Sequence, residues 1–327
     1  MTLRKFSAGF KSSGGFSLNV FTPDEFAAIH RSTLEVLSEV GVFVQKREAR
    51  EIFRAAGARI YDDGLVKIPP HLVEEAIRSA PSTLTLAGRD KSRDIVIEGG
   101  RVSFTNFGEG ICIIDHETGE LRSTTKNDLA TMTRLLDSLD VIGVIERAVG
   151  SQDKPAPMQA IHNYEAMINN TNKHCFLGPE NGHNVEIILA MAAEAVGGPT
   201  ALRDRCPVSF ITCPVSPLRL VEDCCEIIMS SAENGAAVCI LSMAMAGGSS
   251  PVHLAGTLVN HNAEILAGIT LAQLTNKGAK VIYGSSSTAM YLKNASAVVG
   301  TPELAMINAA VAAMARYYLL PSWVAGG

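Results

Sequence analysis

The sequence Leu319-Leu320-Pro321-Ser322-Trp323-Val324-Ala325-Gly326-Gly327 predicts a short β-strand that leads into two glycines. It is the last of six short apolar runs, and each run is separated from the next by a helical pattern. The other five predicted strands span residues 144–149, 174–177, 208–212, 236–242 and 280–283. The predicted helices between them lie near residues 157–171, 183–195, 217–232, 252–276 and 302–318.

This alternation predicts an α/β protein, because short apolar strands between helices form parallel sheets that are buried on both faces. Two architectures are compatible with it, an open doubly wound sheet and a TIM-like (β/α)8 barrel. The first predicted strand is not followed by Gly-x-Gly-x-x-Gly, so a dinucleotide-binding sheet loses its main support. We therefore expect an incomplete TIM-like (β/α)8 barrel, of which about six strands are present.

Residues 1–120 are expected to form an N-terminal α+β region, and residues 121–327 the partial barrel, which breaks off after strand six. Residues 1–21 have no clear period and predict an extended arm. The capping box Thr22-Pro23-Asp24-Glu25 predicts a helix start, and two more helices are expected near 46–56 and between Pro69 and Pro81. The segments 95–97 and 102–104 are predicted to pair as a hairpin through Gly99-Gly100, and 110–114 to form another strand before a turn at 116–120. A second capping box, Thr125 to Asp128, starts the first helix after this region.

Composition excludes several classes of protein. Hydrophobic residues make up 47% of the 327 residues, enough for a large core, and the net charge is −5. The chain has no basic cluster, so nucleic acid is not expected as a partner, and no apolar run is long enough to span a membrane. The seven scattered cysteines indicate free thiols in a reducing cytoplasm, where we expect the protein to be located.

The loops after the predicted strands are rich in small residues and poor in reactive groups. No lysine stands at a strand end and no two carboxylates converge, which argues against a Schiff-base aldolase and a glycosidase. The cysteine and histidine spacings do not match a zinc site, so no protein-bound metal is expected. Glu180 is the one acid at a strand end, where it can bind a cation, move a proton or cap the next helix.

Several other residues have both a functional and a structural interpretation. The hydroxyl groups of residues 285–288 can line a site or face solvent, and the polar patch 260–264 favours a helix–helix or subunit contact over a site. Phe107 and Trp323, the only tryptophan, can offer ring faces to an alkylammonium ion or pack in the core.

Several motifs together resemble the trimethylamine–corrinoid protein methyltransferase family over residues 1–327. They are Thr105-Asn106-Phe107-Gly108-Glu109-Gly110, Asp115-His116-Glu117-Thr118-Gly119-Glu120, Cys213-Pro214-Val215-Ser216-Pro217-Leu218, Asn262-Ala263-Glu264-Ile265-Leu266-Ala267-Gly268, Tyr283-Gly284-Ser285-Ser286-Ser287 and Leu320-Pro321-Ser322-Trp323-Val324-Ala325-Gly326-Gly327. The resemblance implies a TIM-like barrel that moves a methyl group from trimethylamine to the cobalt of a separate corrinoid protein. It also implies a pyrrolysine, encoded by an amber codon, directly after Gly327, and hence a chain that is truncated at that codon.

The resemblance also implies the roles of the candidate residues. Pyrrolysine would be the main catalytic residue, with an imine carbon that adds the amine, while Glu180, Tyr283 and Ser285 would orient groups and exchange protons. The expected substrate-binding residues are Phe107, Gln152, Ser287, Trp323, Gly326 and Gly327. The expected partners are trimethylamine, the corrinoid protein, which carries the cobalamin cofactor, and further copies of the chain in a homo-oligomer.

Two other functions remain open at this point. Relatives without pyrrolysine use quaternary amines of the glycine betaine type, and a truncated chain can also be a non-catalytic remnant. We expect the 327-residue chain alone to be poorly soluble and inactive, because a barrel without its last strands has two open edges and lacks its electrophile.

Overall fold

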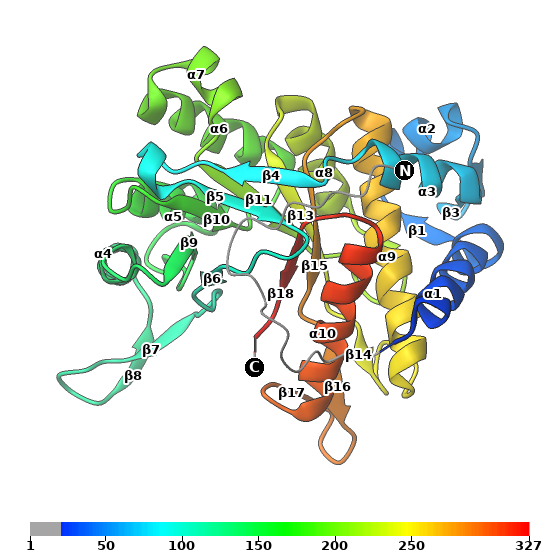
Figure 1. The fold of residues 1–327 in the computed structure, drawn as a ribbon. Helices are drawn as coiled ribbons and strands as arrows, with labels where there is room; N and C mark the ends of the chain where they lie inside the picture. Colours follow the sequence, from blue (N-terminus) through cyan, green and yellow to red (C-terminus); the bar gives the residue numbers. More distant parts are fainter. Residues whose placement is uncertain (1–20, 327) are drawn as a thin grey trace.

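A computed structural model describes residues 21–326, and its centre is a parallel sheet of seven strands in the order β18-β15-β13-β11-β10-β9-β6 (Figure 1). The strands are β6 (Phe104–Thr105), β9 (Ile142–Glu146), β10 (His174–Leu177), β11 (Val208–Thr212), β13 (Ala237–Ser242), β15 (Val281–Ser285) and β18 (Ser322–Val324). All six pairings between neighbours are parallel. The predicted strands and their parallel order are therefore confirmed, and β6 adds a seventh strand.

The predicted hairpin between residues 95–97 and 102–104 is wrong. β5 (Ile95–Glu98) pairs antiparallel with β4 (Thr83–Leu86), while β6 pairs in parallel with β9 at the edge of the central sheet. The glycines do turn the chain, with φ of 101° at Gly100, but the strand that follows fills the open edge of β9. Local turn chemistry could not show which of two edges the strand would join.

Helices cover the outer face of the sheet, as expected for strands joined by right-handed crossovers (Figure 1). They are α4 (Lys126–Asp137), α5 (Gln159–Ile168), α6 (Gly182–Val196), α8 (Glu222–Asn234), α9 (Leu254–Thr275) and α10 (Pro302–Tyr317), while the short α7 (Pro199–Asp204) packs on α6. α8 begins five residues later than predicted, because Arg219–Leu220 forms the short strand β12, which pairs with β1. Among the described residues no helix is long and apolar enough to cross a membrane.

The N-terminal elements pack beside α9 rather than across the inner face of the sheet. They are α1 (Pro23–Glu35), a π-helical turn (Val36–Val40), β1 (Val42–Val44), α2 (Arg47–Ala55), β2 (Arg59–Ile60), β3 (Leu65–Lys67) and α3 (Pro70–Ser79). Both predicted capping boxes are present, at Thr22 with Glu25 and at Thr125 with Asp128. The predicted arm lies almost wholly outside the described residues, and the division of the chain at residue 120 stays a prediction.

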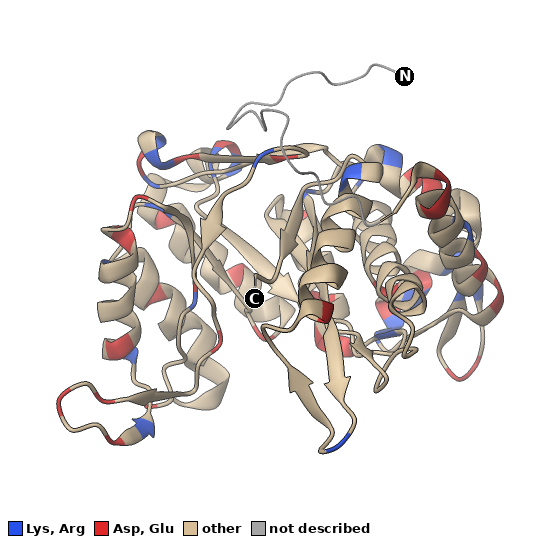
Figure 2. Cartoon of the chain, turned by 60° about the horizontal axis from the view of Figure 1, so that its bottom comes forward, with Lys and Arg blue, Asp and Glu red and all other residues tan. Residues whose placement is uncertain are grey.

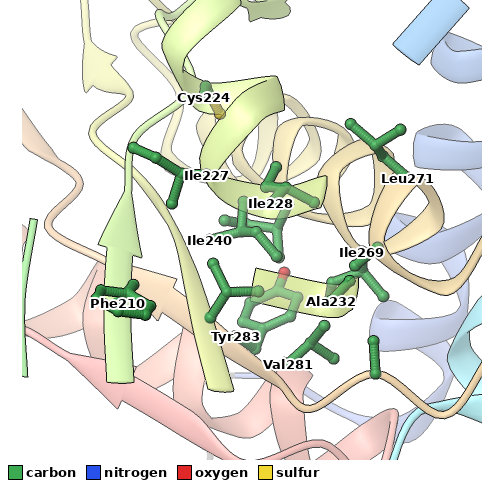
Figure 3. Close-up of a cluster of buried hydrophobic side chains, with 14 of the residues drawn as sticks. Phe210, Cys224, Ile227, Ile228, Ala232, Ile240, Ile269, Leu271, Val281 and Tyr283 are labelled. Atoms are coloured by element: carbon green, nitrogen blue, oxygen red, sulfur yellow. The ribbon is translucent and has the colours of Figure 1, made fainter. Parts of the chain in front are cut away.

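α9 is the central helix of the outer layer, and fifteen of its 22 residues are buried. Figure 3 shows part of this core, where Tyr283 of β15 lies among Ile228, Ile240 and Val281. In the polar patch 260–264 of this helix, His261, Asn262 and Glu264 are buried and have hydrogen-bond partners inside the core. The predicted interpretation of this patch as a helix contact is confirmed, since Asn262 donates to Thr33 of α1.

Two hairpins project from the molecule near the end of the sheet at which β18 leads to the C-terminus (Figure 1). One consists of β7 (Cys112–Ile114) and β8 (Leu121–Ser123), the other of β16 (Thr288–Tyr291) and β17 (Ser296–Val298), beside β14 (Met245–Ala246). Figure 2 shows acidic and basic residues interspersed over the outer helices and loops, with few on the central strands. The charge of the interior therefore depends on a small number of residues.

Candidate active site

The inner face of the sheet forms its own apolar cluster, separate from the outer core. Side chains alternate along each strand, so Val144, Phe176, Cys239, Leu241 and Ile282 face inward while their neighbours face the helices. Leu84 and Leu86 of the β4–β5 hairpin belong to the same cluster and cover one end of it. The active site is therefore expected at the other end of the sheet, where the C-terminal ends of the strands and their loops meet.

Glu146 is a carboxylic acid on this inner face. It lies two residues after Val144 on β9 and is in register with Phe176 on β10, so both side chains point into the interior. Its backbone is fixed by Asn106, whose amide bonds the Glu146 carbonyl oxygen at 2.9 Å and accepts from the Glu146 N–H at 3.0 Å. The Glu146 carboxylate accepts no hydrogen bond from any described residue, although the residue is partly buried.

Burial raises the pKa of Glu146 to about 7, the negative charge of Glu109 adds to the increase, and Arg147 opposes it. Desolvation disfavours the charged form of a carboxyl group, and no hydrogen bond compensates here. A Cβ at Gly108 would lie 2.7 Å from the Glu146 Oε1 atom, so this glycine makes room for the carboxylate. An acid that changes charge near neutral pH in a sheltered site is suited to proton transfer.

An aromatic pair lies beside this acid. Trp323 of β18 stacks on Phe176 with ring centroids 4.1 Å apart and an interplanar angle of 23°. Trp323 is in register with Gly284, where a Cβ would lie 2.6 Å from the Cys239 Sγ atom, so the neighbouring strand must be bare at this point. Trp323 also lines a cavity of about 400 Å³, whose other walls include Val144, Thr105 and Arg316. The two edge strands of the sheet, β6 and β18, thus face one cavity.

Three charged residues of the strand-end loops lie near Glu146, and we refer to this group, Glu109, Arg147 and Glu180, as the entrance. Arg147 follows β9 and forms an ion pair with Glu109, which follows β6. Burial raises the pKa of Glu180, with a smaller increase from Glu109 and a decrease from Arg147. The Arg147 Nη1 atom and the Gln152 Nε2 atom would lie 3.3 and 2.8 Å from a Cβ at Gly150, which places both side chains at the same loop.

Some of the candidate site residues named from the sequence lie at the same end of the sheet. Glu180 is exposed at a strand end, near Arg147 and Glu109, and Gln152 and Trp323 lie at the same end of the sheet. Glu180 and Glu109 both have positive φ, 74° and 76°, which is uncommon for residues with side chains and clusters at functional sites. Phe107 is 81% exposed, and Gly326 is exposed at the end of the described chain, while Gly327 lies outside it.

Other proposed residues face away from the interior. Tyr283 is fully buried on the helix side of β15, and its hydroxyl donates to Asn262 Oδ1 at 2.7 Å. Ser285 follows two residues later on the same side, and its Oγ accepts from the Ser287 N–H at 3.2 Å. Ser287 is buried against His261, with 3.0 Å between its Oγ and the His261 Nδ1 atom. The catalytic and binding roles assigned to these residues stay predictions.

Glu146, Glu109 and Arg147 were missed by sequence reasoning, although a signal was present. Glu146 alternates with Val144 in an apolar strand of a parallel sheet, where both faces are buried and a charged residue is unusual. Glu109 lies inside a motif that carried the family resemblance, but nothing local indicates that Arg147, 38 residues away, is its partner.

The fold defines the class of the protein. The structure is similar to the crystal structure of the monomethylamine methyltransferase MtmB of Methanosarcina barkeri, with a TM-score of 0.56 over 92% of this chain and 66% of that chain. A second structure, the hydroxylamine complex of MtmB, gives a TM-score of 0.55. The sequence identities are 14% and 13%, so these likenesses show the fold alone, a parallel α/β half-barrel of the TIM type.

The sequence defines the family. Residues 12–327 match the trimethylamine methyltransferase (MTTB) family, and the chain belongs to it. Its relatives include the trimethylamine methyltransferase MttB of Desulfitobacterium hafniense, 51% identical over 98% of this chain and 65% of that protein, and MttB1 of Methanosarcina mazei, 43% identical over 98% and 66%. A glycine betaine methyltransferase of D. hafniense is 33% identical over 94% of this chain and 64% of that protein. The chain thus spans about 65% of the length of the D. hafniense MttB.

Proposed function

We propose that this chain is the larger part of a methyltransferase that moves a methyl group from trimethylamine to the cobalt of a cognate corrinoid protein, leaving dimethylamine. The observation that carries the proposal is the family match over residues 12–327. Trimethylamine is favoured over glycine betaine because the relatives named for it are 43–51% identical, against 33% for the glycine betaine enzyme.

The inner site has the properties that a methylated ammonium ion requires. Alkylamines have pKa values near that of a lysine side chain, about 10.4, so trimethylamine enters as a cation at neutral pH. The ring face of Trp323 that does not stack on Phe176 and the carboxylate of Glu146 both attract such a cation, and the aromatic surface suits its methyl groups. The surrounding loops are built largely from small residues, which leaves space for a bulky acceptor.

Glu146 is proposed to exchange the proton of the amine. The amine nitrogen must lose its proton before its lone pair can react, and the departing dimethylamine must gain one. An acid with a pKa of about 7 can perform both transfers near neutral pH. Glu180 would then act at the entrance, where it is more exposed than Glu146 and attracts the incoming cation.

The corrinoid is proposed to arrive on its partner protein as the methyl acceptor, and pyrrolysine to belong to the catalytic machinery. The imine of pyrrolysine would supply an electrophile that no standard side chain offers. The Glu146 carboxylate has no partner among the described residues, so it is available to a nitrogen group placed beside Trp323. This availability makes the inner face a suitable place for such a residue.

The test is trimethylamine-dependent methylation of the corrinoid protein. The gene is expressed in a host that inserts pyrrolysine at amber codons, and the visible spectrum of the methylated cobalt is followed together with dimethylamine release. We expect activity with trimethylamine, and a loss of at least about 100-fold in Glu146→Gln, because general acid–base catalysis contributes that much or more. The control is Glu194→Gln on the exposed face of α6, which should be fully active. Activity with glycine betaine but not with trimethylamine would refute the proposal.

A further inference from the structure

The ion pair between Glu109 and Arg147 is built more firmly than a surface contact. The Glu109 N–H donates to the Arg147 carbonyl oxygen at 3.0 Å, and the next residue, Gly110, donates to Ala148 at 3.0 Å. The carboxylate of Glu109 accepts a hydrogen bond from the Arg147 guanidinium, whose side chain is only 14% exposed. Two loops, one after β6 and one after β9, are therefore joined by both backbone and side chains.

Glu109 is held in this position against a conformational cost. Its φ of 76° lies in the left-handed region, which a residue with a side chain rarely adopts unless its surroundings impose it. Such strain is retained where a group must be aimed. In this conformation the Glu109 side chain reaches the Arg147 guanidinium.

Arg147 has a hydrogen-bond donor that its ion pair with Glu109 does not use. Its Nε atom is buried and has no hydrogen-bond partner in the described structure. Its positive charge lowers the pKa of both Glu146 and Glu180, whereas the charge of Glu109 raises both. The guanidinium thus lies close to the reaction site but is engaged by one of three surrounding carboxylates.

We propose that Glu109 determines substrate specificity by occupying the Arg147 guanidinium, so that the entrance rejects methylated amines that carry a carboxylate of their own. The inference rests on the proposed function, because it concerns the same site. With Arg147 engaged, the entrance presents more carboxylates than cations, which favours a simple trialkylammonium ion. A free guanidinium would bind a substrate carboxylate through two parallel hydrogen bonds.

A comparison of trimethylamine with glycine betaine shows how the engaged guanidinium would exclude a substrate that carries a carboxylate. Both present methyl groups on a cationic nitrogen, but glycine betaine adds a carboxylate one methylene away from it. In the wild-type site this second charge would lie near Glu146, Glu180 and Glu109, while the Arg147 guanidinium beside them is engaged by Glu109. Like charges at close range in a sheltered site repel strongly. The carboxylate therefore excludes the ligand rather than anchoring it.

The experiment measures binding, so that it does not depend on turnover. The dissociation constants of trimethylamine and glycine betaine are measured by calorimetry for the wild-type protein and for Glu109→Gln at neutral pH. Releasing Arg147 should strengthen glycine betaine binding about 10- to 100-fold, the value of one charge-assisted contact. Trimethylamine binding should weaken by less than about tenfold, since only one of the three carboxylates is lost.

Two variants separate the proposal from a general loss of negative charge. Glu117→Gln removes the same charge from the exposed turn of the β7–β8 hairpin and should change neither constant. The double variant Glu109→Gln/Arg147→Gln should lose the gain in glycine betaine binding, because the guanidinium is then absent. The proposal is overturned if Glu109→Gln does not gain affinity for glycine betaine, or if the double variant retains the gain. A failure of trimethylamine-dependent methylation in the wild type would refute the proposed function and leave this result interpretable.

Discussion

Glu146 and Glu264 are two glutamates on opposite faces of the same sheet, Glu146 partly buried and Glu264 fully buried, and they differ in their hydrogen bonds. Glu264 of α9 accepts four hydrogen bonds, from the Ser216 and Ser242 hydroxyls at 2.8 and 2.6 Å, the Leu218 N–H at 3.0 Å and the Asn260 amide at 2.9 Å. Glu146 accepts none from the described residues. Burial raises the pKa of both, but at Glu264 the hydrogen bonds oppose the increase.

The number of hydrogen bonds that a sheltered carboxylate accepts indicates whether its role is structural or functional. A carboxylate whose hydrogen-bonding capacity is filled by neighbours fixes structure, and Glu264 joins α9 to the loop after β11 and to β13. A buried carboxylate without partners costs stability, and such a cost is kept where a ligand or a proton will satisfy it. The contrast supports a structural role for Glu264 and the proposed role of Glu146 in proton transfer.

The largest expected effect is the loss of stability in Glu264→Ala. The substitution leaves one buried and three partly buried donors without an acceptor, which should reduce the free energy of unfolding by about 3–5 kcal/mol. Urea denaturation measures the change, and Glu194→Ala on the exposed face of α6 is the control, expected within about 0.5 kcal/mol. A loss below about 1 kcal/mol would show that the network around Glu264 is not structural.

The opposite sign is expected for Glu146→Gln. The folded-state pKa of Glu146, about 7, is above its ordinary value of 4.5, so the wild type loses stability as the pH rises from about 4.5 through 7. The loss amounts to about 3 kcal/mol at full ionisation, from 1.36 kcal/mol per pKa unit. Glutamine cannot ionise, so the variant should match the wild type near pH 4.5 and exceed it at pH 8.

Chemical denaturation at pH 4.5, 6 and 8 measures this difference. If the variant is as stable relative to the wild type at pH 8 as at pH 4.5, the Glu146 carboxylate is satisfied in the folded protein, and its contrast with Glu264 disappears.

A smaller effect is expected from Gly108→Ala. The new Cβ would lie 2.7 Å from the Glu146 Oε1 atom, so the carboxylate must move or the loop must shift, at a cost of about 1–3 kcal/mol. Gly99→Ala is a suitable control, because a Cβ there meets the Arg316 Cγ atom at an ordinary 3.5 Å. Thermal unfolding and the methylation assay should both be affected by the first variant only. Full activity in Gly108→Ala would indicate that the position of the Glu146 carboxylate is not critical.

The smallest expected effect is spectroscopic. Trp323 is the only tryptophan of the chain and stacks on Phe176 beside Glu146, so a methylammonium ion bound there should change its emission by about a tenth or more. Titration with trimethylammonium chloride should give a saturable change, and sodium chloride at the same ionic strength should not. Equal responses to both salts would place the ligand away from the aromatic pair.

The sequence by itself determined the succession of strands and helices in the partial barrel. Short apolar runs separated by helical patterns gave the six predicted strands, and the capping boxes at Thr22 and Thr125 gave the starts of two helices. These features depend on neighbours within a few residues, through hydrogen bonds to local backbone and the period of side chains. The family resemblance was contained there for the same reason, as short motifs of adjacent residues.

Which face each side chain occupies was decided by the tertiary structure. Tyr283 and Ser285 stand in a conspicuous strand-end motif, yet strand alternation turns them toward α9, while Glu146 and Trp323 turn inward. The seventh strand, β6, and the pairing of Glu109 with Arg147 depend on edges and loops that are distant in sequence. A one-residue change of register exchanges the two faces of a strand, and only the packed sheet fixes that register.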